Sequence, residues 1–131
     1  MATICILDDD AAIREMMCEV LEDAGYQVVT VETGAAALTV LPDLQPDLLI
    51  TDLWLWPMDG LAVCRAMQAN PAISHVPILL CSGGEEPVIS EPRLYTAFLA
   101  KPFNLDSFLR LIAQLMQGCE SHTASRRGDA P

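Results

Sequence analysis

The sequence is poor in positive charge. Its 131 residues include 7 lysines and arginines against 18 aspartates and glutamates, which gives a formal net charge of −11 at pH 7. A chain with this excess of negative charge is repelled by the phosphate backbone of nucleic acids and by anionic lipid surfaces. The composition therefore argues against direct binding to nucleic acid or to a membrane.

Long hydrophobic runs are also missing. No apolar stretch approaches the roughly 20 residues that a membrane-spanning helix needs. The N-terminal sequence MATICILDDD reaches three aspartates before the apolar core of a signal peptide could form. Hydrophobic residues nevertheless make up 52% of the chain, which is enough to build a core and excludes disorder of the whole chain. We expect one soluble domain in the cytoplasm.

Paired cysteines are absent as well. The five cysteines are odd in number, lie far apart and form no CxxC motif or Cys/His cluster. Such spacing supports neither a disulfide framework nor a zinc site. We interpret the cysteines as reduced residues, most of them buried in the core: Cys5, Cys18, Cys64, Cys81 and Cys119.

What the sequence does contain is a regular alternation of short apolar runs and stretches of helical periodicity. The pattern predicts strands at 3–7, 27–31, 48–51, 77–81 and 97–100, and helices at 11–24, 34–41, 60–70 and from 105 onward. We expect Pro42 to end the second helix. Between 83 and 96 the apolar spacing is irregular and Pro87 and Pro92 interrupt it, so at most a short helix fits.

This order of elements predicts an α/β fold of the (βα)5 type. We expect a flavodoxin-like, doubly wound sheet of five parallel strands, with a short or irregular fourth helix. After Gln117 the sequence GCESHTASRRGDAP is polar and has no apolar stripe. We therefore expect residues 1–117 to form the domain and residues 118–131 to form a disordered tail.

Polar residues stand where the predicted strands end, which is the edge at which open α/β sheets bind ligands. They are Asp8, Asp9 and Asp10 after the first strand, Asp52 after the third, Ser82 after the fourth and Lys101 after the fifth. Clustered carboxylates repel one another unless a cation joins them, and Mg²⁺ with oxygen ligands suits such a site. Lys101 and Ser82 could bind phosphoryl oxygens, and Asp52 could attack phosphorus to form an aspartyl phosphate.

These residues and their order resemble the receiver domain of bacterial two-component response regulators. The resemblance covers about 3–117 and rests on four segments in order: ILDDD, DLLITDLWLWPMDG, VPILLCSG and FLAKPF. It implies signal transduction by phosphorelay, in which a histidine kinase or a histidine phosphotransfer protein donates the phosphoryl group. Phosphorylation would then switch binding to an unknown downstream protein. Such a domain is not an enzyme for an external substrate and catalyses only its own phosphorylation and dephosphorylation.

The resemblance also implies roles for single residues. Asp52 would be the phosphoacceptor. Asp8, Asp9 and the backbone carbonyl of Trp54 would bind Mg²⁺ together with Asp52.

The same resemblance assigns the phosphoryl contacts and the switch. Ser82 and Lys101 would bind the phosphoryl group, and Ser82 and Phe98 would be the switch residues, with Phe98 as the rotating aromatic. The peptide bond between Lys101 and Pro102 would be cis.

Three features depart from the family pattern. Trp56 stands where the family usually has proline, and Gly83 follows the switch hydroxyl where alanine is usual. The segment between Ser82 and Lys101 is shorter than usual, and the missing residues fall in the fourth helix. This shortening puts the usual output surface in question.

Three other functions fit parts of the sequence. A flavin carrier of flavodoxin type would need a phosphate-binding loop after the first strand, where three aspartates stand instead. A phosphatase of the haloacid dehalogenase type would use Asp8 and Asp10 as its Asp-x-Asp motif, but the chain is short for that class. The third alternative is a degenerate receiver that binds proteins independently of phosphorylation.

Overall fold

The computed structural model describes residues 1–87 and 94–128, with side chains as far as Gln117. Five parallel strands form one sheet in the order β2-β1-β3-β4-β5. The strands are β1 (Thr3–Leu7), β2 (Gln27–Val31), β3 (Leu48–Asp52), β4 (Ile78–Ser82) and β5 (Ala97–Ala100). The described helices are α1 (Ala11–Asp23), α2 (Gly34–Leu44), α3 (Gly60–Gln68) and α4 (Leu105–Gly128). The predicted α/β fold with five parallel strands is confirmed.

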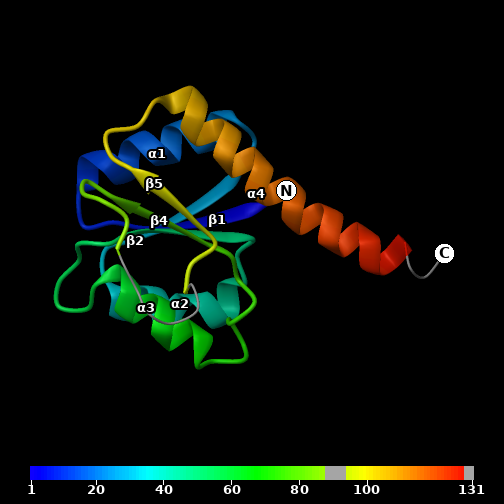
Figure 1. The fold of residues 1–131 in the computed structure, drawn as a ribbon, viewed down its shortest axis with the longest axis horizontal. Helices are drawn as coiled ribbons and strands as arrows, with labels where there is room; N and C mark the ends of the chain where they lie inside the picture. Colours follow the sequence, from blue (N-terminus) through cyan, green and yellow to red (C-terminus); the bar gives the residue numbers. More distant parts are fainter. Residues whose placement is uncertain (88–93, 129–131) are drawn as a thin grey trace.

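Helices cover both faces of the sheet. Helices α1 and α4 lie on one face, and α2 and α3 lie on the other (Figure 1). Side chains along β1 point alternately to the two faces of the sheet. Ile4 and Ile6 pack in the core cluster under α1 and α4. Cys5 and Leu7 pack in the core cluster under α2 and α3. A central strand buried on both faces is apolar on both, as β1 is from Ile4 to Leu7.

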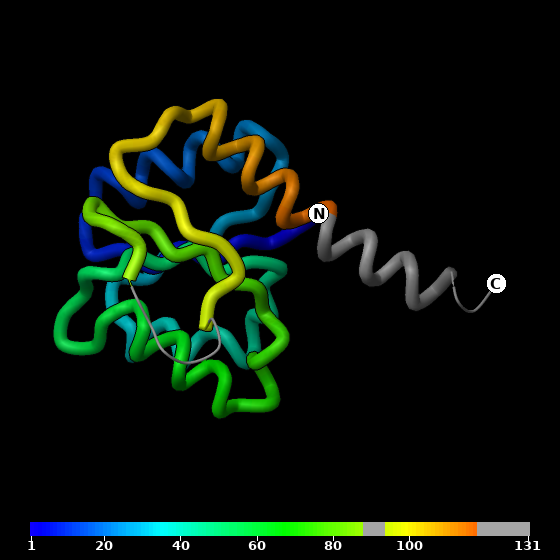
Figure 2. The backbone as a smooth tube through the Cα atoms, viewed as in Figure 1, coloured from blue at the N-terminus to red at the C-terminus, as the bar shows by residue number. Residues whose placement is uncertain are grey.

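The helices begin where the sequence offers capping side chains. The Asp10 carboxylate accepts hydrogen bonds from the first turn of α1, and Thr33 and Asp59 do the same for α2 and α3. Asn104 accepts a bond from the backbone N–H of Ser107 at the start of α4. Each cap lies close to the carboxyl end of a strand, so the loops between strands and helices at this edge are short and fixed. Figure 2 follows the chain through them, from β1 in blue to the yellow segment that contains β5.

The predicted end of α2 at Pro42 is wrong. The helix contains Pro42 and runs on to Leu44. Proline lacks an N–H and its ring crowds the carbonyl four residues earlier, but in the last turn these costs do not stop the helix. The helix ends at Gln45, whose φ of 47° is left-handed and whose N–H donates to the carbonyl of Leu41 at 2.9 Å. The Gln45 side chain donates to the carbonyl of Pro42 at 3.0 Å. This bond gives a partner to one of the carbonyl groups at the end of the helix that have no partner within it.

The segment between β4 and β5 contains no helix in its described parts, residues 83–87 and 94–96. The rest of the short helix that we expected there falls on residues 88–93, outside the described residues. At the other end of the chain, α4 continues to Gly128 and so passes Gln117, where we placed the end of the domain. A helix that is already nucleated by packing propagates into polar residues at little cost. The division into residues 1–117 and 118–131 stays a prediction.

The structure also bears on the membrane and on the cysteines. Within the described residues, no helix is both long enough and apolar enough to cross a bilayer.

Cys5, Cys64 and Cys81 are free and buried, as expected for core residues. Burial raises the pKa of the Cys5 thiol to about 11 and those of Cys64 and Cys81 to about 12, which keeps them protonated and unreactive. Cys18 is free and half-buried, and the side chain of Cys119 lies outside the described part.

Candidate functional site

Three carboxylates meet at the carboxyl edge of the sheet. Strand β1 ends just before Asp8, and its partner β3 ends at Asp52, because the parallel register pairs Leu7 with Thr51. Carboxylate oxygens of Asp8, Asp9 and Asp52 all lie within 4.8 Å of one another. Asp8 and Asp9 are adjacent in the sequence, and Asp52 lies 44 positions after Asp8. The structure brings the three residues together, as expected from the sequence. Hard oxygen donors at this spacing are the ligands that Mg²⁺ prefers.

Lys101 reaches the same point from the end of β5. Its Nζ lies 3.0 Å from Oδ2 of Asp8 and 3.3 Å from Oδ1 of Asp52, so one ammonium group donates to both carboxylates. The exposed fractions of the three side chains are 18% for Lys101, 4% for Asp8 and 11% for Asp52. Lys101 is also the only lysine in the chain. The sequence alone therefore singles it out as the one ammonium side chain that could serve this site.

Burial and neighbouring charges act differently on the pKa values of Asp52 and Lys101. Burial and the nearby carboxylates of Asp8 and Asp9 raise the pKa of Asp52, and the Lys101 ammonium only partly offsets them. Burial by itself would lower the pKa of Lys101, but the hydrogen bond and charge of Asp8, and then those of Asp52, outweigh it and raise that pKa. Lys101 therefore stays charged at neutral pH, whereas the ionised form of Asp52 is disfavoured by folding.

The raised pKa of Asp52 predicts how the stability of the folded protein depends on pH. Protonated Asp52 favours the folded state, so its contribution is full below the usual pKa of 3.8 and is lost as the pH rises through the folded value. We therefore expect Asp52→Asn to have a higher melting temperature than the wild type at neutral pH, with the difference shrinking as the pH is lowered. Thermal unfolding followed by circular dichroism across this range measures it. A variant that melts at or below the wild-type temperature at neutral pH would contradict the electrostatic account.

A second network fixes the backbone that carries Asp8. The Arg14 guanidinium donates to the carbonyl of Asp8 at 2.8 Å and pairs with Glu32 at 3.3 Å. The other carboxylate oxygen of Asp8, Oδ1, accepts from the backbone N–H of Asp10 at 2.9 Å. These contacts orient Asp8 toward Lys101. Nothing in the sequence singles out Arg14, because its partners come from the end of β1 and from the loop after β2, and no local pattern joins them.

The loop after β3 is anchored by a close backbone approach. The backbone N–H of Gly60 donates to the carbonyl of Leu53 at 2.9 Å. A Cβ atom at Gly60 would lie 2.5 Å from the backbone oxygen of Asp52, so only glycine fits there. Asp59 and Gly60 in the DG pair thus start α3 directly against the backbone of Asp52 and hold that residue in place.

The remaining predicted residues lie around this centre. Ser82 is fully buried, and its hydroxyl accepts a hydrogen bond from the N–H of Gly84 at 3.2 Å. The backbone N–H of Lys101 donates to the carbonyl of Ser82 at 2.7 Å, which joins the ends of β4 and β5. Phe98 is half-buried against the cluster under α2 and α3. Trp54 follows Asp52 by two residues and is 67% exposed.

Two cis peptide bonds and a tyrosine–glutamate hydrogen bond lie near this edge of the sheet. The predicted cis peptide between Lys101 and Pro102 is confirmed, and the bond between Trp56 and Pro57 is cis as well, which the sequence analysis did not predict. Tyr95 is buried, and its hydroxyl donates to Glu86 at 2.7 Å, so it bridges the two ends of the segment between β4 and β5. Phe98 was the aromatic predicted for this region, and no sequence pattern pointed to Tyr95.

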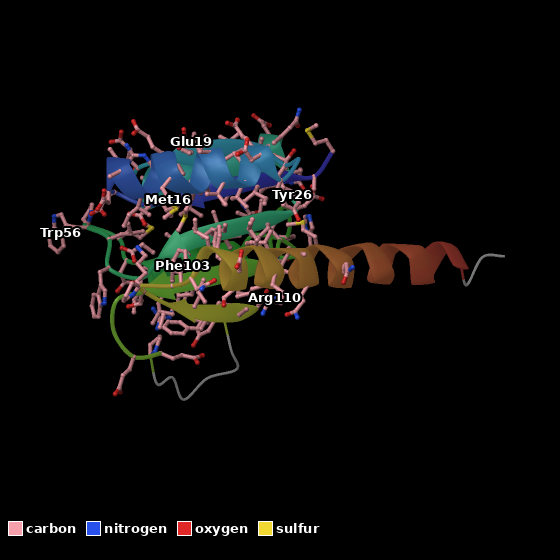
Figure 3. All side chains as sticks on the ribbon, turned by 90° about the horizontal axis from the view of Figure 1, so that it is seen from above. Met16, Glu19, Tyr26, Trp56, Phe103 and Arg110 are labelled. Carbon is pink, nitrogen blue, oxygen red and sulfur yellow. The ribbon has the colours of Figure 1, made fainter. Side chains whose placement is uncertain are left out.

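A groove opens beside Lys101, between α1 and the chain that follows β5. It has a volume of about 460 Å³, and Met16 from α1 and Phe103 from the turn between β5 and α4 are among its lining residues (Figure 3). Phe103 stacks on Phe108, with ring centroids 5.0 Å apart. The groove is largely apolar, and Lys101 is among its lining residues.

Comparison with known proteins decides the family. The family model of the response regulator receiver domain matches residues 4–113. The chain belongs to this family. This receiver is similar to the DNA-binding response regulator MtrA of Mycobacterium tuberculosis, with 38% identity over 85 residues, which cover 65% of this chain and 36% of MtrA. It is also similar to the DNA-binding dual master transcriptional regulator RpaA of Synechocystis, with 29% identity over 89% of this chain and 50% of RpaA.

Solved structures agree with this assignment. The chemotaxis response regulator CheY4 of Vibrio cholerae superposes with a TM-score of 0.78 at 28% identity, covering 88% of this chain and 98% of that chain. A putative response regulator from Chloroflexus aurantiacus gives a TM-score of 0.78 at 30% identity, with the same coverage of both chains. The chain is therefore a receiver domain with the fold of the solved response regulator receivers, and phosphorylation-based signalling is consistent with this family.

The exclusion of nucleic acid as a partner was wrong. The curated relatives MtrA and RpaA are named DNA-binding, and this receiver spans only 36% and 50% of their lengths. The net charge of −11 describes the residues of this chain alone. Charge on a receiver does not decide what a protein that contains such a receiver binds, because the DNA contacts can come from other residues.

Proposed function

We propose that this receiver accepts a phosphoryl group on Asp52, with Mg²⁺ held by Asp8, Asp9 and Asp52, and takes it from a histidine kinase or a histidine phosphotransfer protein. The observation that carries the proposal is the position of Lys101, whose ammonium group bonds to both Asp8 and Asp52. A fixed cation beside a carboxylate cluster is what an incoming phosphoryl group needs, since otherwise four anionic groups would meet.

The metal ligands would be the three carboxylates and the backbone carbonyl of Trp54. The clustering of carboxylate oxygens within 4.8 Å fits a small oxygen-loving dication. When bound, Mg²⁺ supplies positive charge that offsets the repulsion between the anionic donor and the anionic acceptor.

The chemical step uses Asp52 as the nucleophile. An oxygen of its carboxylate forms a bond to phosphorus while the bond from phosphorus to the donor's histidine nitrogen breaks, and the leaving imidazole keeps the electron pair. Lys101 exchanges its bond to Asp52 for one to a phosphoryl oxygen and stays bound to Asp8. Gly60 and Arg14 keep the backbones of Asp52 and Asp8 in place, so the nucleophile is oriented before the donor arrives.

The switch would use Ser82 and Phe98. The Ser82 hydroxyl is bonded to the N–H of Gly84 in this structure, and turning toward a phosphoryl oxygen would release that bond. Phe98 would then rotate inward, in the manner of packed elements that have discrete arrangements. The receiver acts on no external metabolite in this proposal and catalyses only its own phosphorylation and dephosphorylation, in the cytoplasm. The degenerate-receiver alternative is not favoured, because the acidic cluster and its lysine are assembled as the chemistry requires.

Metal-dependent phosphorylation tests the proposal. With acetyl phosphate and Mg²⁺, intact-mass measurement should show the gain of one phosphoryl group, which hydroxylamine removes because the linkage is an acyl phosphate. With EDTA in place of Mg²⁺ the gain should disappear. Equal labelling in EDTA, or a product that resists hydroxylamine, would contradict the proposed chemistry.

Metal binding to the unphosphorylated protein makes a separate prediction. The chain has two tryptophans, and Trp54 lies two residues from Asp52, so tryptophan fluorescence should change as Mg²⁺ is added. Asp9→Asn should weaken binding about tenfold or more, because it removes one charged ligand of the ion. Asp43→Asn, on the exposed side of α2, is the matched control and should titrate as the wild type does. Identical titrations of Asp9→Asn and the wild type would place the metal elsewhere.

A further inference from the structure

Both tryptophans of the chain stand on the loop after β3, and both are exposed. The exposed fraction of the residue is 67% for Trp54 and 86% for Trp56. Trp56 projects from one end of the molecule, away from the sheet and its helices (Figure 3). Tryptophan is usually largely buried, and its apolar ring gains free energy when it leaves water. Two exposed rings in a chain with 5% aromatic residues therefore call for a functional explanation.

The loop that carries the rings is held in place. Leu53 and Leu55 alternate with the tryptophans and are buried at 4% and 7% exposure in the cluster under α2 and α3. The backbone N–H of Leu53 donates to the carbonyl of Cys81 at 2.8 Å, and that of Leu55 donates to the carbonyl of Leu53 at 3.2 Å. The inward leucines thus fix the outward direction of the tryptophans. A partner that covers the rings would lose little conformational entropy in ordering this loop.

The surroundings of the loop are acidic. Asp9, Asp59 and Glu85 lie at the same edge of the sheet, after β1, β3 and β4. The two cations that the structure ties to this edge are already paired, Lys101 with Asp8 and Asp52, and Arg14 with Glu32. Asp59 caps α3, while Asp9 and Glu85 form no ion pair within the described part of the chain, so the rings face solvent beside net negative charge. A guanidinium group gains from both features, since it stacks on an indole face and is attracted by carboxylates.

We propose that Trp54 and Trp56 form a docking site for an arginine-bearing segment of a partner protein. The partner's guanidinium groups stack on the two indole rings, and the acidic edge of the sheet supplies long-range attraction. The apolar faces of the rings select a planar cation over a compact, strongly hydrated ammonium group, so arginine is preferred to lysine. The site lies beside Asp52, but binding at it does not depend on phosphorylation and stands apart from the function proposed above.

A capped glycine–arginine peptide tests the site, with the same peptide containing neutral citrulline in place of arginine as the comparison. The measurements are made in EDTA, so that no divalent cation occupies the carboxylates, and at about 0.15 M salt, where weak charge attraction is screened. In a ¹⁵N-labelled sample, the two indole N–H signals should shift with the arginine peptide. The citrulline peptide should leave both signals in place.

Variants separate the rings from the charge. By anisotropy of a dye-labelled arginine peptide, Trp54→Ala and Trp56→Ala should each weaken binding about threefold, and the double variant about tenfold. Trp56→Phe should fall between Trp56→Ala and the wild type, because phenylalanine keeps a weaker aromatic face. Leu105→Ala is the matched control, since Leu105 is an exposed apolar side chain on α4, and it should bind as the wild type does. Undiminished binding by the double variant, or equal binding of the citrulline peptide, would overturn the proposal.

Discussion

The Asp52→Asn variant is expected to gain no phosphoryl group from acetyl phosphate under conditions that label the wild-type protein completely. The asparagine amide has no anionic oxygen, so it cannot form the bond to phosphorus. The neighbouring carboxylates do not replace it. Asp8 and Asp9 are the metal ligands of this proposal, and Asp8 also accepts from Lys101 and from the N–H of Asp10, so neither is expected to serve as the acceptor. Intact-mass measurement over time compares the two proteins.

A matched carboxylate outside the site controls for general effects of charge. Asp106 is exposed in the first turn of α4, and Asp106→Asn should be labelled at the wild-type rate. Because folding disfavours the ionised form of Asp52, its replacement should not unfold the protein, and circular dichroism can verify this. Labelling of Asp52→Asn at even a tenth of the wild-type rate would mean that another residue is the acceptor.

Lys101→Gln is expected to slow phosphorylation by acetyl phosphate about a hundredfold, the loss typical for removing one oriented group that stabilises charge in a transition state. The variant loses the ammonium group that both carboxylates share, so the donor's negative charge meets Asp8 and Asp52 without a fixed counter-charge. The raised pKa of Lys101 keeps the wild-type amine charged at neutral pH, so the comparison is between a cation and a neutral group.

Arg110→Gln is the control for the second prediction. Arg110 is exposed on α4, and its removal changes the net charge by the same amount as the removal of Lys101. We expect Arg110→Gln to be phosphorylated within about twofold of the wild-type rate, since exposed charges at a distance are screened. Equal rates for Lys101→Gln and Arg110→Gln would show that Lys101 acts only through net charge.

Most of the fold could be predicted from the sequence, because each strand carries its own signal. The apolar run at 48–51 predicts a strand covered on both faces, and β3 is buried on both sides. The end of α2 was predicted wrongly because Pro42 was given too much weight. Pro42 marks a break in an isolated helix, but packing of Leu41 against the sheet carries α2 through it.

The acidic cluster was predictable for a topological reason. Parallel strands place their carboxyl ends at one edge, so Asp8, Asp52 and Lys101 had to be near one another once the strands were assigned. The contacts of Arg14 with the carbonyl of Asp8 and of Tyr95 with Glu86 were not predictable, since they depend on side-chain directions across separate loops. Composition was also misleading about partners, because net charge is a property of a chain and DNA binding is a property of particular surfaces.

Chemical mapping of the phosphorylated residue tests the central claim most directly. Borohydride reduces an aspartyl phosphate to homoserine, and peptide sequencing by mass spectrometry then locates the change. After treatment with acetyl phosphate and Mg²⁺, we predict homoserine in place of Asp52 and at no other aspartate. Homoserine at Asp8 or Asp9, or a reduced protein with no homoserine at all, would contradict the assignment of Asp52 as the phosphoacceptor.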